Sequence, residues 1–264
     1  MIKTKPSFVT EQFFQELARA GTCALVMDYD SVFAPFSASI TERLPSITTL
    51  QLVDNIVVNC RTRVVMVTDR KASDLLRTFR VLPRPEVWGR SGLERLYSDD
   101  RLQTLSFNNE IDRAFIAIDH FLERDGLGRL TTQEPGSIIV RWSGLPEADA
   151  REARACALRA FAFLCGSPGI SICETPTSIE ACCRRNHVPR LLQMLTDEMP
   201  LNTPIAYLGS ETSDANTFQA LRNDFLSVLV APSRSRTDVD AWIQPPDQLI
   251  QFLADWIRAR GGEL

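Results

Sequence analysis

An unbroken apolar run at residues 23–27 ends in two aspartates, Asp28 and Asp30. A continuous apolar run of this kind is typical of a strand that is buried on both faces of a parallel sheet. On an extended chain the two carboxylates would point to opposite sides, but a turn after Asp28 can bring both toward one pocket. The sequence therefore predicts a buried strand with a pair of carboxylates at its carboxyl end.

The spacing of the two aspartates suits phosphoryl chemistry. One carboxylate can attack a phosphorus atom and help to hold a divalent cation, while the other shuttles a proton. The alternative is that the pair only opens a loop, because Asp favours turns. The pair alone does not decide between the two interpretations.

Composition excludes several classes of protein. A chain of 264 residues with 44% hydrophobic and 23% charged residues is typical of a globular protein with one large domain or a core with an insertion. A net charge of -4 argues against nucleic acid or an anionic membrane as a partner. The N-terminal residues lack the apolar segment of a signal peptide, and no apolar run approaches the roughly 20 residues that span a bilayer. We therefore expect a cytoplasmic protein.

The seven cysteines form no CxxC pair, and the chain has only two histidines. These spacings do not suit a zinc site. Reduced, mostly buried thiols are expected.

Two rhythms of secondary structure alternate along the chain. The first segment predicts helix, strand, helix, strand, helix and strand at residues 10–19, 23–27, the second half of 39–57, 63–67, 72–79 and 86–89. The middle predicts a hairpin at 94–105 with its turn at 98–100, then helix 109–123, loop 127–135, strand 137–142, helix 147–164, and strands 168–173 and 178–182. The last segment predicts helix 188–199, strand 205–208, a helix that ends at 221, strand 226–230 and helix 248–257.

This order predicts an α/β fold with an inserted domain. Alternating strands and helices are typical of a parallel sheet, and strands in hairpin order with two long helices are typical of an α+β domain. We assign residues 1–95 and 186–264 to the core and residues 96–185 to the inserted cap.

Polar residues follow several strands of the predicted core. They are Asp28 and Asp30, then Thr68, then residues 186–187, and finally residues 209–218. Parallel α/β sheets bind ligands beyond the carboxyl ends of their strands, so these positions are candidates for one site.

Longer stretches around these positions carry a resemblance. They are residues 28–35 (DYDSVFAP), 88–96 (WGRSGLERL), 141–145 (RWSGL) and 207–218 (YLGSETSDANTF), followed by Thr237, Ala241 and a terminal helix with Phe252 and Leu253. Their order is similar to DYDGTLAP, WGSHGxERL, HWRGL and YLGDDxTDEDAF of the trehalose-6-phosphate phosphatase family within the haloacid dehalogenase (HAD) superfamily. The resemblance covers nearly the whole chain and implies a Rossmann-like parallel-sheet core with an α+β cap.

The resemblance also implies roles for individual residues. Asp28 takes the position of the nucleophile, Asp30 that of the acid/base and Thr68 that of the phosphate-binding hydroxyl, while His187 falls where the family has a lysine. Sugar-phosphate contacts are implied at Arg70, Ser91, Arg141 and Glu180. Magnesium is implied at Asp28, Asp30, Glu211 and Asp214.

Several chemical positions depart from the family pattern. Ser210 replaces a metal-binding aspartate, and a hydroxyl is a poorer magnesium ligand than a carboxylate. His187 is shorter than lysine and mostly neutral at pH 7. Asp69 and Ser31 replace glycines, and Val32 replaces a threonine. A carboxylate at residue 69 would repel a phosphate dianion.

Two hypotheses follow for function. The first is a magnesium-dependent sugar-phosphate phosphatase with impaired activity, which works through an aspartyl phosphate and binds magnesium weakly or not at all. The second is a protein that has kept the fold but lost catalysis, and that acts as a sugar-phosphate sensor or as the partner of another protein. A structural protein unrelated to phosphate is a third alternative.

Overall fold

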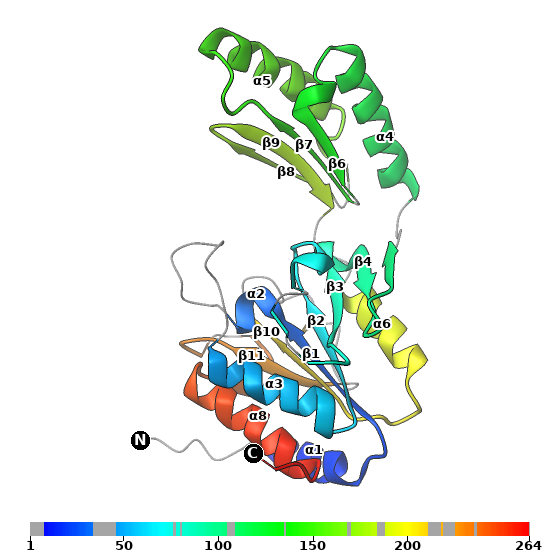
Figure 1. Ribbon diagram of the computed structural model, residues 1–264, viewed down its shortest axis with the longest axis vertical. Coiled ribbons are helices and arrows are strands. Elements are labelled where there is room, and N and C mark those ends of the chain that lie inside the picture. Colours follow the sequence, from blue (N-terminus) through cyan, green and yellow to red (C-terminus); the bar gives the residue numbers. More distant parts are fainter. Residues whose placement is uncertain are drawn as a thin grey trace. The chain divides into compact units, whose positions relative to one another are not determined.

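The computed structural model describes residues 8–33, 46–75, 78–79, 81–104, 109–134, 136–167, 170–183, 188–210, 218, 225–234 and 237–263. It divides into two compact units, Met1–Gln103 with His187–Leu264, and Thr104–Asn186 (Figure 1). None of its described helices is long and apolar enough to cross a membrane.

The first unit is built on an eight-stranded sheet in the order β12-β11-β10-β1-β2-β3-β4-β5. Pairing is parallel from β12 through β3, and β4 is antiparallel to β3. The strands are β1 (Cys23–Asp28), β2 (Thr62–Val67), β3 (Glu86–Gly89), β4 (Glu94–Leu96), β5 (Leu102–Thr104), β10 (Ile205–Gly209), β11 (Leu226–Val230) and β12 (Ala241–Ile243). All six residues of β1 are buried, as its apolar run requires.

Helices pack against this sheet through apolar faces. They are α1 (Phe8–Arg19), α2 (Tyr29–Val32), α3 (Ile47–Asn59), α6 (Val188–Glu198) and α8 (Asp247–Ala259), with 3-10 turns η2 (Ala72–Leu75) and η3 (Arg90–Gly92). α8 contacts both α1 and α3 (Figure 1). Trp256 of α8 is fully buried in the cluster that contains Leu25 and Met27, and its indole N–H donates to Thr62 Oγ1 at 3.0 Å.

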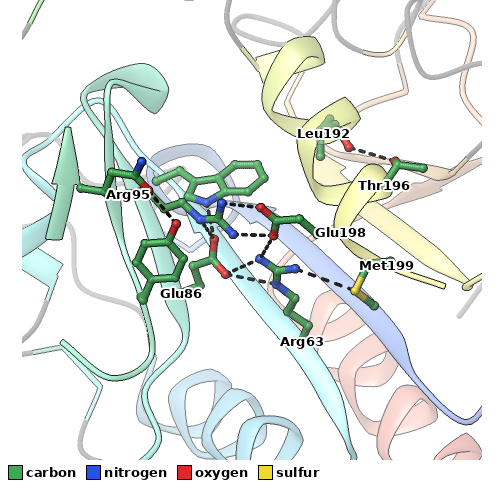
Figure 2. Close-up of polar contacts among 10 residues, drawn as sticks. Arg63, Glu86, Arg95, Leu192, Thr196, Glu198 and Met199 are labelled. Atoms are coloured by element: carbon green, nitrogen blue, oxygen red, sulfur yellow. Dashed lines mark hydrogen bonds and ion pairs between the residues drawn. The ribbon is translucent and has the colours of Figure 1, made fainter. Parts of the chain in front are cut away.

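Helix α6 is held at its C-terminal end by four charged side chains, which we call the closed ionic cluster: Arg63, Glu86, Arg95 and Glu198 (Figure 2). Arg95 donates to both oxygens of Glu198 at 2.7 and 2.6 Å and to Glu86 Oε1 at 2.6 Å. Arg63 donates to Glu86 Oε2 at 2.8 Å and to Glu198 Oε2 at 2.7 Å. The cluster ties α6 to the amino-terminal ends of β2 and β3 and to β4.

The second unit is a four-stranded antiparallel sheet with two helices. The strands are β6 (Thr131–Glu134), β7 (Ser137–Arg141), β8 (Ile170–Thr175) and β9 (Ser178–Cys183), in the order β6-β7-β9-β8. Helices α4 (Asn109–Arg124) and α5 (Glu147–Ala162) and the 3-10 turn η4 (Gly128–Leu130) complete it. Ile118 and Leu122 of α4 and Ala157 of α5 join Ile138 and Val140 of β7 in one buried cluster.

The predicted fold class is confirmed, because a parallel-dominated core and a separate α+β unit are both present. The first unit extends to Gln103 because the hairpin after β3 belongs to its sheet. Its turn lies where the sequence predicted it, with the Tyr97 N–H donating to the Arg101 carbonyl at 2.9 Å.

Some elements differ from the predictions. The predicted loop 127–135 contains η4 and β6, whose sequence TTQE is an edge strand without apolar residues. β12 was not predicted, since it is a three-residue edge strand. Of the predicted helix 72–79, the structure describes only a 3-10 turn at its start. The predicted helix that ends at residue 221 lies outside the described residues apart from Phe218, which is helical.

All seven cysteines are free thiols, as predicted. Cys23, Cys60 and Cys156 are buried, but Cys165 and Cys173 are exposed, so burial is less general than expected.

Candidate functional site

Asp28 is the last residue of β1 and begins the short helix α2. Its backbone is extended, and its Oδ1 accepts a hydrogen bond from the Ser31 N–H at 3.0 Å. Asp is among the residues most favoured at this capping position, because its side chain satisfies a backbone donor of the first helical turn. The residue is only 4% exposed. The cap therefore fixes the Asp28 carboxylate at the carboxyl end of β1.

Asp30 lies in the first turn of α2 and accepts hydrogen bonds from residues that follow β2. Thr68 Oγ1 donates to its Oδ2 at 2.5 Å, and Arg70 Nε donates to its Oδ1 at 2.9 Å. The Asp69 N–H is 3.4 Å from Oδ2. Both side chains of the ion pair are partly buried, at 25% exposed for Arg70 and 16% for Asp30. Each oxygen of Asp30 thus receives a hydrogen bond.

Strand register explains why these residues meet. Asp28 is paired with Val67 of β2, so Thr68 follows directly beside it. On the other side of β1, Met27 is paired with Leu208 of β10, which places Ser210 just beyond the end of that strand. The chain runs from β1 toward β3 on one side and returns through β10 to β12 on the other, so the strand order reverses beside β1. Open α/β sheets bind ligands at such a switch point.

The ring of Tyr29 lies beside the Arg70 guanidinium. Tyr29 is 1% exposed, and the Arg70 guanidinium carbon lies 5.5 Å from the ring centroid. Burial raises the pKa of the Tyr29 phenol above its ordinary value. Tyr29 therefore stays neutral at pH 7, and its ring helps to orient the guanidinium.

Replacement of a family glycine by Ser31 causes no backbone strain. Ser31 lies inside α2, where its backbone is helical, and it is not among the residues with positive φ. Its Oγ is buried and has no hydrogen-bond partner in the described structure. The cost of this substitution is therefore an unsatisfied hydroxyl rather than lost backbone freedom.

The predicted site residues are only partly within the described residues. Asp28, Asp30, Thr68 and Arg70 come together, with Ser210 at the end of the neighbouring strand. His187, Glu211 and Asp214 lie outside the described residues, as does the side chain of Ser91. The predicted convergence of Asp28 with Asp214 therefore stays a prediction.

Arg141 and Glu180 lie in the second unit. Ile139 is paired with Glu180 across β7 and β9, and Arg141 is two residues beyond Ile139, so both charged side chains belong to one face of the sheet. This is the face opposite to Ile138 and Val140, which pack in the buried cluster with α4 and α5. Arg141 Nη1 donates to Thr132 Oγ1 at 3.2 Å.

Charged groups of both signs lie at the ends of β1 and β2. Residues 28–31 and 68–71 carry the carboxylates of Asp28, Asp30 and Asp69 and the cations of Arg70 and Lys71. The carboxylate oxygens of Asp28 and Asp30 are of the kind that binds a hard divalent cation such as Mg²⁺. In the part of the chain that the structure describes, no three His, Cys, Asp or Glu side chains form a metal-binding group. A full set of ligands would need residues beyond those described.

Comparison with known sequences found neither a matching family model nor a matching curated protein. Solved structures do match. Trehalose-6-phosphate phosphatase of Aspergillus fumigatus has a TM-score of 0.62 and 16% identity, with 94% of this chain and 97% of that chain covered. The C-terminal domain of the Candida albicans trehalose synthase regulatory protein has a TM-score of 0.54 and 14% identity, with 93% and 97% covered. A HAD-superfamily phosphatase from Bacteroides thetaiotaomicron has a TM-score of 0.54 and 12% identity, with 89% and 95% covered.

These matches define the class of fold. The chain has the HAD fold, a Rossmann-like core with a cap. Within that class, its fold is similar over nearly its whole length to those of trehalose-6-phosphate phosphatases.

Proposed function

We propose that this protein is a sugar-phosphate phosphatase of the trehalose-6-phosphate phosphatase type with impaired activity. The observation that carries the proposal is that the Asp28 and Asp30 carboxylates and the Thr68 hydroxyl lie at the carboxyl ends of β1 and β2, beside the switch point of the sheet. A nucleophile, a proton carrier and a hydroxyl donor are the groups that phosphomonoester hydrolysis through a covalent intermediate requires.

The reaction would proceed in two displacements at Asp28. A carboxylate oxygen of Asp28 attacks phosphorus, the bond between phosphorus and the sugar oxygen breaks, and Asp30 gives a proton to the leaving oxygen. Water then attacks the aspartyl phosphate, Asp30 takes a proton from it, and inorganic phosphate and the Asp28 carboxylate are restored. The Thr68 hydroxyl and the Arg70 guanidinium supply donors for the phosphoryl oxygens.

The contacts of Asp30 support impaired activity. A proton carrier must reach the leaving oxygen, yet each Asp30 oxygen accepts a hydrogen bond, from Arg70 on one side and Thr68 on the other. The two bonds fix the orientation of the Asp30 carboxylate, so it is less free to turn toward the leaving oxygen. Ser210 and His187 each remove a charge that the family uses, and loss of one preorganised electrostatic contact commonly costs about 2.7–4 kcal/mol of transition-state stabilisation.

Magnesium would be held by Asp28 and Asp30 with Glu211 and Asp214, and its binding would be weak because Ser210 contributes no charge. When bound, the cation would neutralise charge that develops on the phosphoryl group.

The substrate we propose is a sugar phosphate. Arg141 and Glu180 present a guanidinium and a carboxylate on one face of the second sheet, and such groups hydrogen-bond sugar hydroxyls. Because Ser91, Arg141 and Ser143 differ from the family pattern, trehalose 6-phosphate would be hydrolysed poorly or not at all.

The alternative proposal is a catalytically inactive protein that binds a sugar phosphate or another protein. The ion pair between Arg70 and Asp30 favours it, since this pair restricts the movement of the Asp30 carboxylate. Similarity of the fold to a domain of a trehalose synthase regulatory protein is consistent with it.

Phosphate release from a panel of sugar phosphates, with and without magnesium, separates the two proposals. Impaired catalysis predicts slow release that Asp28→Asn abolishes. No release above the Asp28→Asn background, combined with saturable sugar-phosphate binding by calorimetry, would favour the inactive binding protein. Rapid turnover of trehalose 6-phosphate by the unmodified protein would contradict the proposed impairment.

A further inference from the structure

We infer that Glu94 is a positioning residue: it holds the loop of residues 68–72 so that Thr68 and Arg70 present their donors to the site. The part of this inference that concerns phosphate rests on the proposed function. The part that concerns the loop rests on contacts alone.

Glu94 is a buried carboxylate outside the strand-end residues described above. It is the first residue of β4 and is 7% exposed. Its Oε2 accepts a hydrogen bond from the Ala72 N–H at 2.8 Å. Ala72 begins the 3-10 turn η2, two residues after Arg70, and is fully buried. A buried backbone donor costs free energy if its acceptor is removed, so this bond constrains where the loop can lie.

Backbone contacts join the same two segments. The Thr68 N–H donates to the Trp88 carbonyl at 3.0 Å, and the Arg90 N–H donates to the Arg70 carbonyl at 2.8 Å. Gly89 lies so close to the loop that a Cβ added to it would be 2.3 Å from the Ala72 nitrogen. Residues 88–94 therefore pack directly against the loop and bond its backbone, and Glu94 adds a bond from its side chain.

The backbone of Arg90 shows that residues 88–94 are held in a specific conformation. Its φ is 53°, a left-handed backbone that a residue other than glycine adopts at a cost of about 1 kcal/mol or more. Its Nε lies 3.9 Å from Glu94 Oε1. Glu94 thus interacts with the strained residue through one oxygen and with the loop through the other.

The same segment reaches α6, which begins immediately after residue 187. Gly92 has φ of +96°, and a Cβ on it would be 2.0 Å from Leu191 Cδ1. Residues 88–96, where the resemblance implies a sugar contact at Ser91, therefore contact both the loop of residues 68–72 and helix α6. Of these residues, only Glu94 uses a side-chain oxygen to hold the loop of Thr68 and Arg70 in the described contacts.

Hydrogen exchange of the ligand-free full chain tests the positioning role. Glu94→Ala should accelerate exchange in residues 68–75 by about tenfold or more and leave β11 unchanged. Glu94→Gln should change it much less, because an amide oxygen can still accept from Ala72. Glu16→Ala is the control, since Glu16 is an exposed acidic residue of α1 in the same unit. Unchanged exchange in residues 68–75, or equal acceleration throughout the core, would overturn the inference.

Titration with inorganic phosphate tests the consequence for the site. Glu94→Ala should weaken the binding of phosphate by about fivefold or more, whereas Glu94→Gln and Glu16→Ala should stay near the unmodified protein. Equal phosphate affinity in Glu94→Ala and the unmodified protein would overturn this step. If the unmodified protein binds no phosphate, the proposed function fails, and hydrogen exchange still decides the role of Glu94. If Glu94→Ala does not fold, Glu94→Asp replaces it, since its shorter carboxylate should lose the bond to Ala72.

Discussion

The two ends of strand β2 carry the same chemistry arranged in opposite ways. At the amino-terminal end, Arg63 belongs to the closed ionic cluster, where two guanidinium groups meet two carboxylates. Beyond the carboxyl end, Arg70 pairs with Asp30 while Asp28 and Asp69 add two further carboxylates nearby in the chain. The first group matches two guanidinium groups with two carboxylates, and the second places three carboxylates beside Arg70 and Lys71.

This difference separates a structural role from a ligand-binding one. In the closed ionic cluster, Arg95 and Glu86 are almost fully buried and Glu198 is paired with two guanidinium groups. Hydrogen bonds from Arg95 are the main cause of a lowered pKa for Glu198, about 2. The strand-end site lies at the switch point of the sheet, where the oxygens of Asp28, Asp30 and Thr68 gather at a position suited to a ligand.

The largest effect is expected from breaking the closed ionic cluster. Arg95→Met should lower the free energy of unfolding by about 3 kcal/mol or more, because it removes a buried guanidinium that donates to both Glu86 and Glu198, although Glu86 keeps its bonds from Arg63 and Trp88. Urea unfolding measures this loss. Arg101→Met is the control: its side chain is 64% exposed, so removal of its charge should cost about 1 kcal/mol or less. A similar small loss for both variants would show that the cluster does not stabilise the core.

Acid should weaken the same cluster. The folded-state pKa of Glu198 is lowered from 4.5 to about 2, so its contribution to stability is complete above pH 4.5 and is lost as pH falls toward 2. Because the Glu198 side chain is 39% exposed, the effect should be smaller than that of Arg95→Met. Glu198→Gln should flatten the dependence of the unfolding midpoint on pH in this window. An unchanged pH dependence in Glu198→Gln would contradict the prediction.

Sequence reasoning found the strands of the core more easily than its polar contacts. β1, β2, β10 and β11 were predicted because burial on both faces leaves continuous apolar runs. β6 and β12 were missed because short edge strands need no such run. α2 was missed because it is a single turn that the Asp28 cap begins.

The same limit applies to the site. The strand ends indicated Asp28, Asp30 and Thr68, and the resemblance added Arg70, but nothing in the sequence indicated that Arg70 and Thr68 hold Asp30. The contact between Arg95 and Glu198 joins residues 103 positions apart, so it depends on the tertiary fold. Glu94 lay inside a noted stretch, yet only the approach of Ala72 gives it a role.

The strand-end site should respond to an added carboxylate in the way that a cation site does. Ser210→Asp combined with His187→Lys should raise phosphatase activity by at least about tenfold, which corresponds to about 1.4 kcal/mol on the barrier. Ser210→Asp alone should tighten magnesium binding, measured by calorimetric titration. If neither activity nor magnesium affinity increases, the substitutions at these positions are not the cause of impaired activity. Tight magnesium binding by the unmodified protein would mean that another group has replaced the ligand lost at residue 210.

The smallest effect concerns the hydroxyl beside Asp28. Ser31→Ala should raise the free energy of unfolding by about 1 kcal/mol, because the buried Oγ of Ser31 has no hydrogen-bond partner in the described contacts. The variant keeps the backbone N–H of residue 31, which donates to Asp28 Oδ1. Alanine also suits the helical backbone of α2. Thermal unfolding with and without phosphate distinguishes two origins of the unpaired hydroxyl. If Ser31→Ala is more stable in both conditions, the hydroxyl is only a cost. If phosphate stabilises the unmodified protein more than Ser31→Ala, then the Ser31 hydroxyl donates to the bound phosphate. In that case the hydroxyl that is unpaired in the free protein serves ligand binding.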